Sequence, residues 1–282
     1  MKKFVVLVLS LVLMTAALVG CSGSSDQGQT PAPGQSQQGQ SSYKEKLVVG
    51  ATAKPHSEIL EIVKPILAEE GIELEIKEFT DYVLINPALV EGQIDANFFQ
   101  HIPYLDDFNS QNNANLKWIA KIHNEPMGIY SNTITDINSV KKGATVGIPN
   151  DATNGGRALM VLESAGLIKL KEGVGVLATE QDIVENPKKI KITMMDAPML
   201  PRALEDLDLC VINSNYALEA NLNPVEDSIF MEPKDSPFAN VLVVRPEDEN
   251  KESIQKLAKA MQSPEVKQFL EENYPGSCVP SF

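Results

Sequence analysis

Leu47-Val48-Val49-Gly50 is a short apolar run, followed by an amphipathic segment at residues 57–69 and an alternating segment at residues 73–79. A short apolar run is typical of a buried strand, and apolar residues three and four positions apart are typical of a helix. The three segments predict a strand–helix–strand unit, in which Pro65 kinks or shortens the helix. Such a unit belongs to an α/β fold.

The same alternation continues along the rest of the chain. Further strands are predicted at residues 94–98, 116–122, 145–149, 190–195, 207–212 and 238–244, and further helices at residues 83–91, after Pro103, and at residues 153–165, 198–207, 246–261 and 264–273. This order favours mainly parallel sheets with helical crossovers. Because 282 residues exceed one ordinary domain, we expect two α/β lobes, with a ligand bound beyond the carboxyl ends of the strands.

The first twenty residues have the pattern of an export signal. Lys2 and Lys3 precede an apolar run at residues 4–19, which is shorter than the roughly 20 apolar residues of a membrane span. Cys21 directly follows Leu18-Val19-Gly20, and this motif resembles the lipobox of bacterial lipoproteins. We predict a signal peptide at residues 1–20 and lipidation at Cys21. The alternative is an ordinary secretory signal with a chance cysteine.

A segment of serine, glycine, glutamine and proline follows, with Asp26 as its one charged residue up to position 42. Such a composition buries too little apolar surface to fold. We therefore predict a lipidated flexible tether at residues 21–43, with an end-to-end distance of about 25 Å.

Composition and motifs exclude several functions. The 38 acidic and 24 basic residues give a net charge of −14, which argues against nucleic acid as a partner. His56, His101 and His123 form no metal-binding motif, and the sequence lacks a Walker loop and a G-x-S-x-G elbow. We expect no catalytic residue, no metal and no cofactor. Cys210 and Cys278 are interpreted as a buried thiol and a peripheral thiol, with pairing left open.

The segment PNDATNGGR at residues 149–157 joins a predicted strand to a predicted helix. Thr153 or Asn154 is the candidate N-cap, and the two glycines allow the backbone to approach a ligand. A helix N-terminus attracts anions, and Arg157 adds a guanidinium that can hold a carboxylate through two hydrogen bonds. We predict a carboxylate site. The alternative is a surface arginine beside a glycine turn.

The segment DANFFQHIPY at residues 95–104 contains three aromatic residues and His101, and Tyr82 lies upstream. Together these residues could enclose a small apolar side chain. A thioether contacts aromatic rings favourably. The alternative is a strand end with aromatic residues in the core.

With these segments the chain resembles the methionine-binding lipoprotein family (NlpA-type), the substrate-binding components of methionine ABC importers. The resemblance runs from about Leu47 to the C-terminus and includes Asp81-Tyr82-Val83, Phe99-Gln100-His101, Pro149-Asn150-Asp151 and Val211-Ile212-Asn213. It implies a two-lobe periplasmic-binding-protein fold of type II, in which each lobe is a mixed sheet flanked by helices. The ligand would occupy the interlobe cleft. Lobe 1 would comprise residues 44–125 and 240–282, and lobe 2 residues 126–239.

The resemblance also implies ligand-binding residues. Arg157 would hold the ligand carboxylate, Asn154, Asn213 and Asn240 would contact the head group, and Tyr82, Phe99, His101 and Tyr104 would surround the side chain. Asn213 and Asn240 rest on the resemblance alone. Phe98 and the Gly155-Gly156 pair depart from the family pattern, so Phe98 could change the shape of the pocket.

The function that the resemblance implies is transport. We expect a monomeric, non-enzymatic protein, anchored by its lipid at the extracytoplasmic face of the cell membrane. It would bind L-methionine and deliver it to an ABC permease with its ATPase. The alternatives are D-methionine, a methionine-containing dipeptide, another small apolar amino acid, or a surface adhesin.

Overall fold

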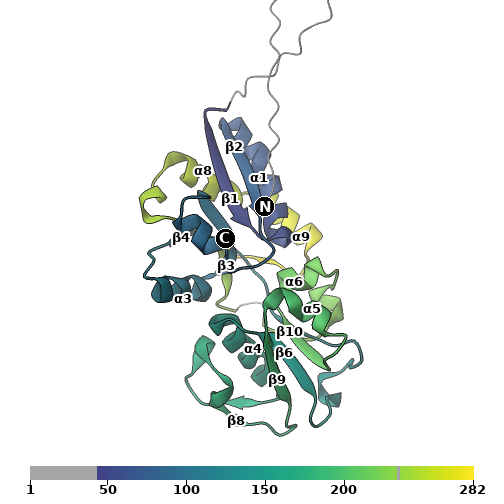
Figure 1. Ribbon diagram of the computed structural model, residues 1–282. Coiled ribbons are helices and arrows are strands. Elements are labelled where there is room, and N and C mark those ends of the chain that lie inside the picture. Colours follow the sequence, from purple (N-terminus) through teal and green to yellow (C-terminus); the bar gives the residue numbers. More distant parts are fainter. Residues whose placement is uncertain (1–42, 234–235) are drawn as a thin grey trace, which may run out of the picture. The chain divides into compact units, whose positions relative to one another are not determined.

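The computed structural model describes residues 43–233 and 236–282 (Figure 1). The predicted signal peptide, the lipidation site Cys21 and the tether up to residue 42 lie outside the described residues. Within the described part of the chain, no helix has the length and apolar character that crossing a membrane requires.

Six strands form the first sheet, in the order β13-β4-β12-β3-β1-β2. They are β1 (Glu45–Ala51), β2 (Ile72–Glu78), β3 (Ala96–His101), β4 (Lys117–Asn124), β12 (Ala239–Val244) and β13 (Val279–Pro280). β1 is parallel to β2 and β3, whereas β12 is antiparallel to β3 and β4. The sheet thus combines early segments of the chain with late ones.

Helices cover both faces of the first sheet. α1 (Glu58–Glu69), α8 (Glu252–Met261) and α9 (Pro264–Asn273) pack on one face, and α2 (Ile85–Val90) and α3 (Ile102–Asn112) pack on the other. Successive side chains of a strand point to opposite faces. In β12, Leu242 and Val244 accordingly join the α1 side, whereas Val241 and Val243 join the α2 side.

Five strands form the second sheet, in the order β11-β5-β10-β6-β9. They are β5 (Gly128–Tyr130), β6 (Thr145–Pro149), β9 (Lys191–Met195), β10 (Leu209–Ile212) and β11 (Ser228–Met231). α4 (Ala152–Ser164) packs on one face, and α5 (Leu200–Ala203) and α6 (Ser214–Glu219) pack on the other. β10 divides its side chains between these faces, with Leu209 and Val211 toward α4.

Smaller elements connect these layers. They are α7 (Pro224–Asp227), the two-stranded sheet of β7 (Lys169–Leu170) and β8 (Ile183–Glu185), the short helices η2 (Ile137–Ser139), η3 (Gly175–Leu177), η4 (Glu180–Asp182), η5 (Ala197–Met199) and η6 (Pro246–Asp248), and the π-type turn η1 (Ala53–Ser57).

The predicted α/β class with mixed sheets and flanking helices is confirmed. The expectation of mainly parallel sheets is wrong, because β5, β11, β12 and β13 all pair antiparallel with their neighbours. The predicted lobe boundaries stay a prediction. The first sheet draws on residues 45–124 and 239–280, and the second on residues 128–231.

Cys210 and Cys278 are both free thiols. Cys210 is buried in β10, as expected. The expectation of a peripheral Cys278 is wrong, since this residue is buried in the core beneath α1 and α9.

Candidate functional site

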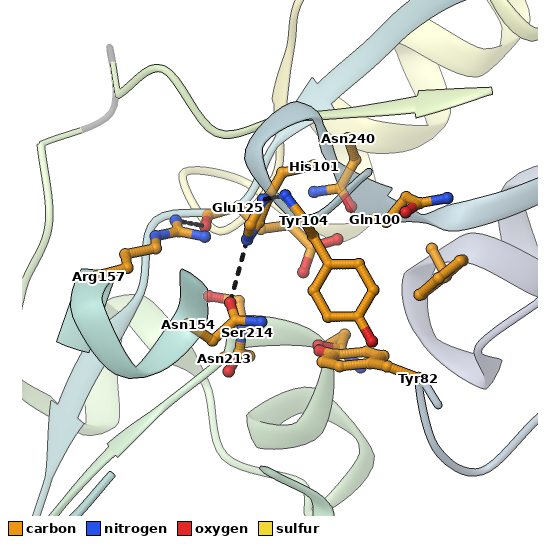
Figure 2. A pocket seen from close by; sticks show the side chains of 12 residues that line it. Tyr82, Gln100, His101, Tyr104, Glu125, Asn154, Arg157, Asn213, Ser214 and Asn240 are labelled. Carbon is orange, nitrogen blue, oxygen red and sulfur yellow. Dashed lines mark hydrogen bonds between the residues drawn. The ribbon is translucent and has the colours of Figure 1, made fainter. Parts of the chain in front are cut away.

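One pocket is lined by all eight residues that the resemblance implied for ligand binding (Figure 2). These residues are Tyr82, Phe99, His101, Tyr104, Asn154, Arg157, Asn213 and Asn240. They come from elements of both sheets: His101 ends β3, Asn240 lies in β12, Arg157 lies in α4 and Asn213 follows β10. Binding of a ligand by these residues stays a prediction.

Arg157 is buried and makes its bidentate contact with a residue of this chain. Its Nε donates to both carboxylate oxygens of Glu232 at 3.2 Å, and its Nη2 donates to Oε2 of Glu232 at 2.5 Å. Nη2 also donates to the backbone oxygen of Glu125 at 2.8 Å. The guanidinium carbon lies 4.1 Å from the centre of the Phe238 ring, which favours the cation further.

One nitrogen of Arg157 remains for a ligand. Within residues 43–233 and 236–282, Nη1 has no hydrogen-bond partner. The Nε–Nη2 edge, which offers two hydrogen bonds to one carboxylate, is occupied by Glu232. A carboxylate in this pocket would therefore approach Nη1.

The start of α4 differs from its prediction. Its N-cap is Asp151, whose Oδ1 accepts a hydrogen bond from the backbone nitrogen of Asn154 at 2.9 Å, so neither Thr153 nor Asn154 is the cap. The two glycines allow close contact with neighbouring backbone and not with a ligand. A Cβ atom on Gly156 would overlap the carbonyl group of Val176, and a Cβ atom on Gly155 would lie too close to the carbonyl oxygen of Pro149. They are needed for packing.

A hydrogen-bond network orients three pocket residues, His101, Asn154 and Asn213. His101 Nδ1 accepts from the Tyr104 backbone nitrogen at 3.1 Å, so Nε2 carries the proton and donates to Asn154 Oδ1 at 3.1 Å. Asn213 Nδ2 donates to the same oxygen at 2.8 Å, and Asn154 Nδ2 donates to Asp151. Burial, reinforced by the charge of Arg157, lowers the pKa of His101 to about 3. The ring is therefore neutral at physiological pH.

Three aromatic rings form one wall of the pocket. The centre of the Tyr82 ring lies 5.7 Å from Phe99 and 5.9 Å from Tyr104. The Tyr82 hydroxyl donates to Asn215 Oδ1 at 2.5 Å, which links the loop before α2 to α6. Phe98 does not line this pocket. Its side chain is buried on the α1 face of β3, so the expectation that Phe98 alters the pocket is not met.

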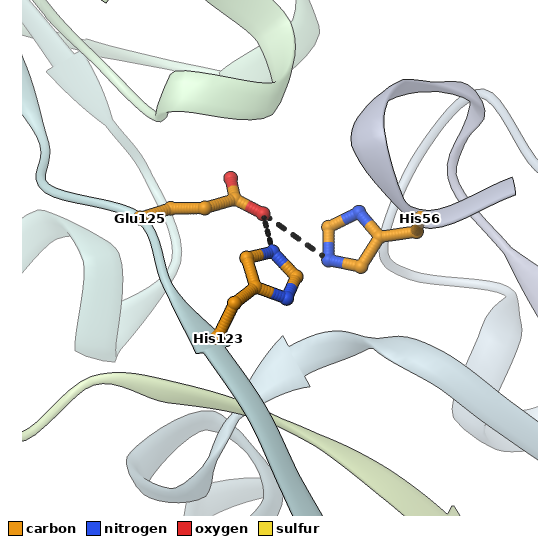
Figure 3. A group of neighbouring side chains, drawn as sticks. All are labelled: His56, His123 and Glu125. Carbon is orange, nitrogen blue, oxygen red and sulfur yellow. Dashed lines mark hydrogen bonds and ion pairs between the residues drawn. The ribbon is translucent and has the colours of Figure 1, made fainter. Parts of the chain in front are cut away.

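The structure brings Glu125, which lines the pocket, together with His56 and His123 (Figure 3). The distance from Glu125 Oε1 is 2.6 Å to His123 Nε2 and 3.3 Å to His56 Nε2. All three residues are buried, and their candidate ligand atoms lie within 4.8 Å of one another. Two imidazoles and a carboxylate are a donor set that zinc accepts. No sequence motif indicated this cluster.

Several residues of the site were missed from the sequence. Gln100, Glu125, Ser214 and Asn215 line the pocket as well. Gln100 is held by a buried amide network in which its Nε2 donates to Asn86 and Asn97. The neighbourhood of His101 in the strand could have indicated Gln100. Glu232 pairs with Arg157 across 75 positions, and no local signal announces it.

The pocket is small and adjoins a larger cavity. Its volume is about 20 Å³, which is room for about one water molecule. The neighbouring cavity of about 520 Å³ shares Tyr82 and Tyr104 with it and is also lined by Asp81, Asp151 and Met199. A larger ligand enters the pocket only if the side chains around it move apart.

Comparison with known proteins identifies the relatives of this chain. Residues 47–282 match the model of the NlpA lipoprotein family. The D-methionine-binding lipoprotein MetQ of Salmonella typhimurium is 42% identical over 234 residues, which cover 82% of this chain and 86% of the relative. The protein of the same name from Escherichia coli K12 is 39% identical over 266 residues, covering 93% and 92% of the two chains.

Solved structures agree with this assignment. A nutrient binding protein from Burkholderia cenocepacia bound to methionine has a TM-score of 0.82 and 44% identity, covering 84% of this chain and all (100%) of that one. Lipoprotein Tp32 from Treponema pallidum has a TM-score of 0.81 and 38% identity, covering 84% and 99% of the two chains. The predicted two-lobe type II binding-protein fold is confirmed by such neighbours. Together, the pocket between two α/β layers and these matches establish that the chain belongs to the NlpA lipoprotein family, whose members are substrate-binding proteins of ABC importers and not enzymes.

Proposed function

We propose that this protein binds L-methionine and delivers it to the permease of an ABC importer. The observation that carries the proposal is the pocket in which Arg157 and three aromatic rings meet. Nη1 of Arg157 is available to a carboxylate, and the ring faces of Tyr82, Phe99 and Tyr104 suit a thioether. The methionine-binding relatives named above support the same ligand class.

Stereochemistry is the finer part of the proposal. Curated relatives carry the name D-methionine-binding lipoprotein, so D-methionine is the main alternative. A methionine-containing dipeptide or another small apolar amino acid would use the same carboxylate contact. A surface adhesin is less favoured, because a buried arginine and a row of fixed amides are features of a small-molecule pocket.

The proposed setting is the extracytoplasmic face of the cell membrane. Cys21 would carry the lipid, and residues 21–43 would tether a monomeric binding body within reach of the permease and its ATPase. Two or more acyl chains make such an anchor durable, whereas one chain binds only marginally. Since the pocket is nearly filled at about 20 Å³, we infer that ligand enters and leaves as the lobes open about their hinge.

Titration calorimetry tests the proposal. The mature protein, purified in detergent, is unfolded and refolded to remove co-purified ligand, and then titrated with L-methionine, D-methionine, a methionine-containing dipeptide and leucine. We expect L-methionine to bind most tightly. Tight binding of another compound without binding of L-methionine would reject the assignment.

A further inference from the structure

The pocket contains one carboxylate that, in the described part of the chain, forms no ion pair with an arginine or lysine side chain. Arg157 is the one arginine or lysine that lines it in the described part of the chain, and its guanidinium is paired with Glu232. Glu125 lines the same pocket and is buried. A buried carboxylate is unfavourable unless hydrogen bonds and an opposite charge support it.

Two histidines supply hydrogen-bond donors to this carboxylate. His56 Nδ1 is hydrogen-bonded to the Thr52 hydroxyl at 2.8 Å, and its Nε2 faces Asn240 Oδ1 at 3.2 Å and Glu125 Oε1 at 3.3 Å. This arrangement fits a neutral ring that carries its proton on Nε2. Burial lowers the pKa of His56 to about 4, so the ring is neutral at physiological pH.

The contacts of His123 also fit a ring with a single proton, on Nε2. Its Nε2 donates to Glu125 Oε1 at 2.6 Å, and its Nδ1 is buried with no hydrogen-bond partner. A protonated ring would therefore bury an unpaired N–H group, which is costly. Burial alone would raise the pKa of the Glu125 carboxyl group, but the two histidines and Arg157 more than offset it, so this pKa lies below its usual value. Glu125 is thus an anion.

The second oxygen of Glu125 is unused. Both histidines contact Oε1, and Figure 3 shows the other oxygen pointing away from the two rings. No residue described in the structure donates a hydrogen bond to Oε2. Asn213 Oδ1, on the same pocket, is a further buried acceptor without a partner, and the Asn213 amide is oriented by its bond to Asn154. The pocket therefore presents two free acceptors.

We propose that Oε2 of Glu125 binds the ammonium group of the ligand, and that His56 and His123 are positioning residues that hold the carboxylate for this contact. The inference rests on the proposed function, because it takes the ligand to be an α-amino acid. The carboxylate and ammonium groups of such a ligand sit on neighbouring atoms. Their partners are neighbours too, since Arg157 Nη2 donates to the Glu125 backbone oxygen at 2.8 Å. Ligands without a free ammonium group are then excluded by an unpaired buried carboxylate.

A divalent cation is the competing way to compensate Glu125. The donor set is suitable, but the hydrogen-bonded arrangement places protons on both Nε2 atoms that a metal would need. The 2.6 Å contact between His123 and Glu125 is a hydrogen bond, shorter than the roughly 3.3 Å between donors around a tetrahedral zinc with bonds near 2.0 Å. We therefore favour the ammonium group.

The test compares two ligands in three proteins. Methionine and its analogue without the amino group, 4-(methylthio)butanoate, are titrated into the refolded mature protein, Glu125→Gln and Glu232→Gln. Glu232→Gln is the matched control, because it removes a buried carboxylate beside Arg157 that does not line the pocket. We expect Glu125→Gln to reduce the preference for methionine over the analogue by about 30-fold or more, as breaking a buried charge pair does. Glu232→Gln should change the affinities for both ligands by a similar factor, because both carry the same carboxylate.

Several results would overturn the inference. One is that Glu125→Gln weakens the binding of both ligands by the same factor, or leaves the preference for methionine over the analogue unchanged. Another is that Glu232→Gln lowers this preference as much as Glu125→Gln does. Binding of Zn²⁺ or Ni²⁺ alone to the parent protein, abolished in Glu125→Gln, would assign the carboxylate to a metal. If Glu125→Gln does not fold, Glu125→Asp takes its place, and a preference within threefold of the parent's then counts against the contact.

The test also separates this inference from the proposed function. If another α-amino acid binds in place of methionine, the comparison is made with that compound and its deaminated analogue, so the inference can survive the loss of the methionine assignment. If methionine binds and its preference does not depend on Glu125, the proposed function stands and the inference falls. A protein that binds no amino acid rejects both.

Discussion

Arg157 joins the pocket to the second sheet through a buried ion pair. Its guanidinium and the Glu232 carboxylate are both nearly inaccessible to solvent, and Glu232 Oε2 also accepts from the Met127 backbone nitrogen at 3.2 Å. Removing one partner of such a pair leaves an isolated buried charge. Arg157 therefore contributes to stability as well as to the proposed carboxylate contact.

We predict that Arg157→Ala lowers the free energy of unfolding by about 3–5 kcal/mol, the cost of breaking a buried pair. Urea denaturation of the ligand-free protein at neutral pH measures this loss. The double variant Arg157→Ala/Glu232→Gln is the control, because it removes the stranded charge and should regain at least half of the stability. If Arg157→Ala is as stable as the parent, the ion pair has no structural role.

At the scale of elements, α4 illustrates how a helix is fitted to its surroundings. Gly155 and Gly156 lie in its second turn, where glycine lowers helix propensity. The reason is steric, since η3 crosses Gly156 so closely that a side chain there would overlap the carbonyl of Val176. The weak helix former is retained because the backbone of η3 lies where a methyl group would be.

Gly156→Ala should therefore destabilise the protein although alanine is the better helix former. Overpacking costs about 1–3 kcal/mol, and the gain in propensity is at most about 1 kcal/mol. Ser164→Ala, at the exposed end of the same helix, is the matched control and should change stability by less than about 0.5 kcal/mol. Thermal unfolding of both variants measures the difference. Equal melting temperatures of the two variants would show that η3 moves away from an added methyl group at little cost.

Local patterns located several elements closely, whereas the helix predicted at residues 246–261 begins only at Glu252 and the shortest strands were missed. Periodicity located β1, α1 and β6 to within two residues at each end, because their burial follows the sequence directly. β5 and β11 were missed, since strands of three and four residues carry almost no periodic signal. The antiparallel pairings depend on where the chain crosses from one sheet to the other. No local sequence pattern encodes these crossings.

The site divides in the same way. Arg157 lies in one of the segments singled out from the sequence, and Phe99 and Tyr104 lie in another with Tyr82 upstream, so these parts of the site were predictable. Asn213 and Asn240 were found by resemblance alone. Glu125 and Glu232 act through tertiary contacts with Arg157, His56 and His123, and only the folded chain brings these together.

At the scale of the whole molecule, residues from the layers of both sheets meet at the pocket and form hydrogen bonds with one another. His101 at the end of β3 donates to Asn154 in α4, and Tyr82 donates to Asn215 in α6. A ligand that contacts residues from both layers loses part of its binding site when either layer unfolds locally. Its binding energy should therefore stabilise both sheets together.

The two buried thiols allow this coupling to be measured. Cys210 lies in the second sheet, where burial raises its thiol pKa to about 12, and Cys278 lies in the core of the first sheet, where burial also raises the pKa. Both thiols react only when their surroundings open, so labelling rates report the open fraction of each region.

We predict that ligand at 1,000 times its Kd slows the labelling of both cysteines by about 1,000-fold. Mass spectrometry after pulses of a thiol reagent gives the two rates separately, and an amino acid that shows no binding in the calorimetric titration serves as the control. Protection of Cys210 alone would mean that the ligand is held by the second sheet only, which would contradict a pocket shared by both.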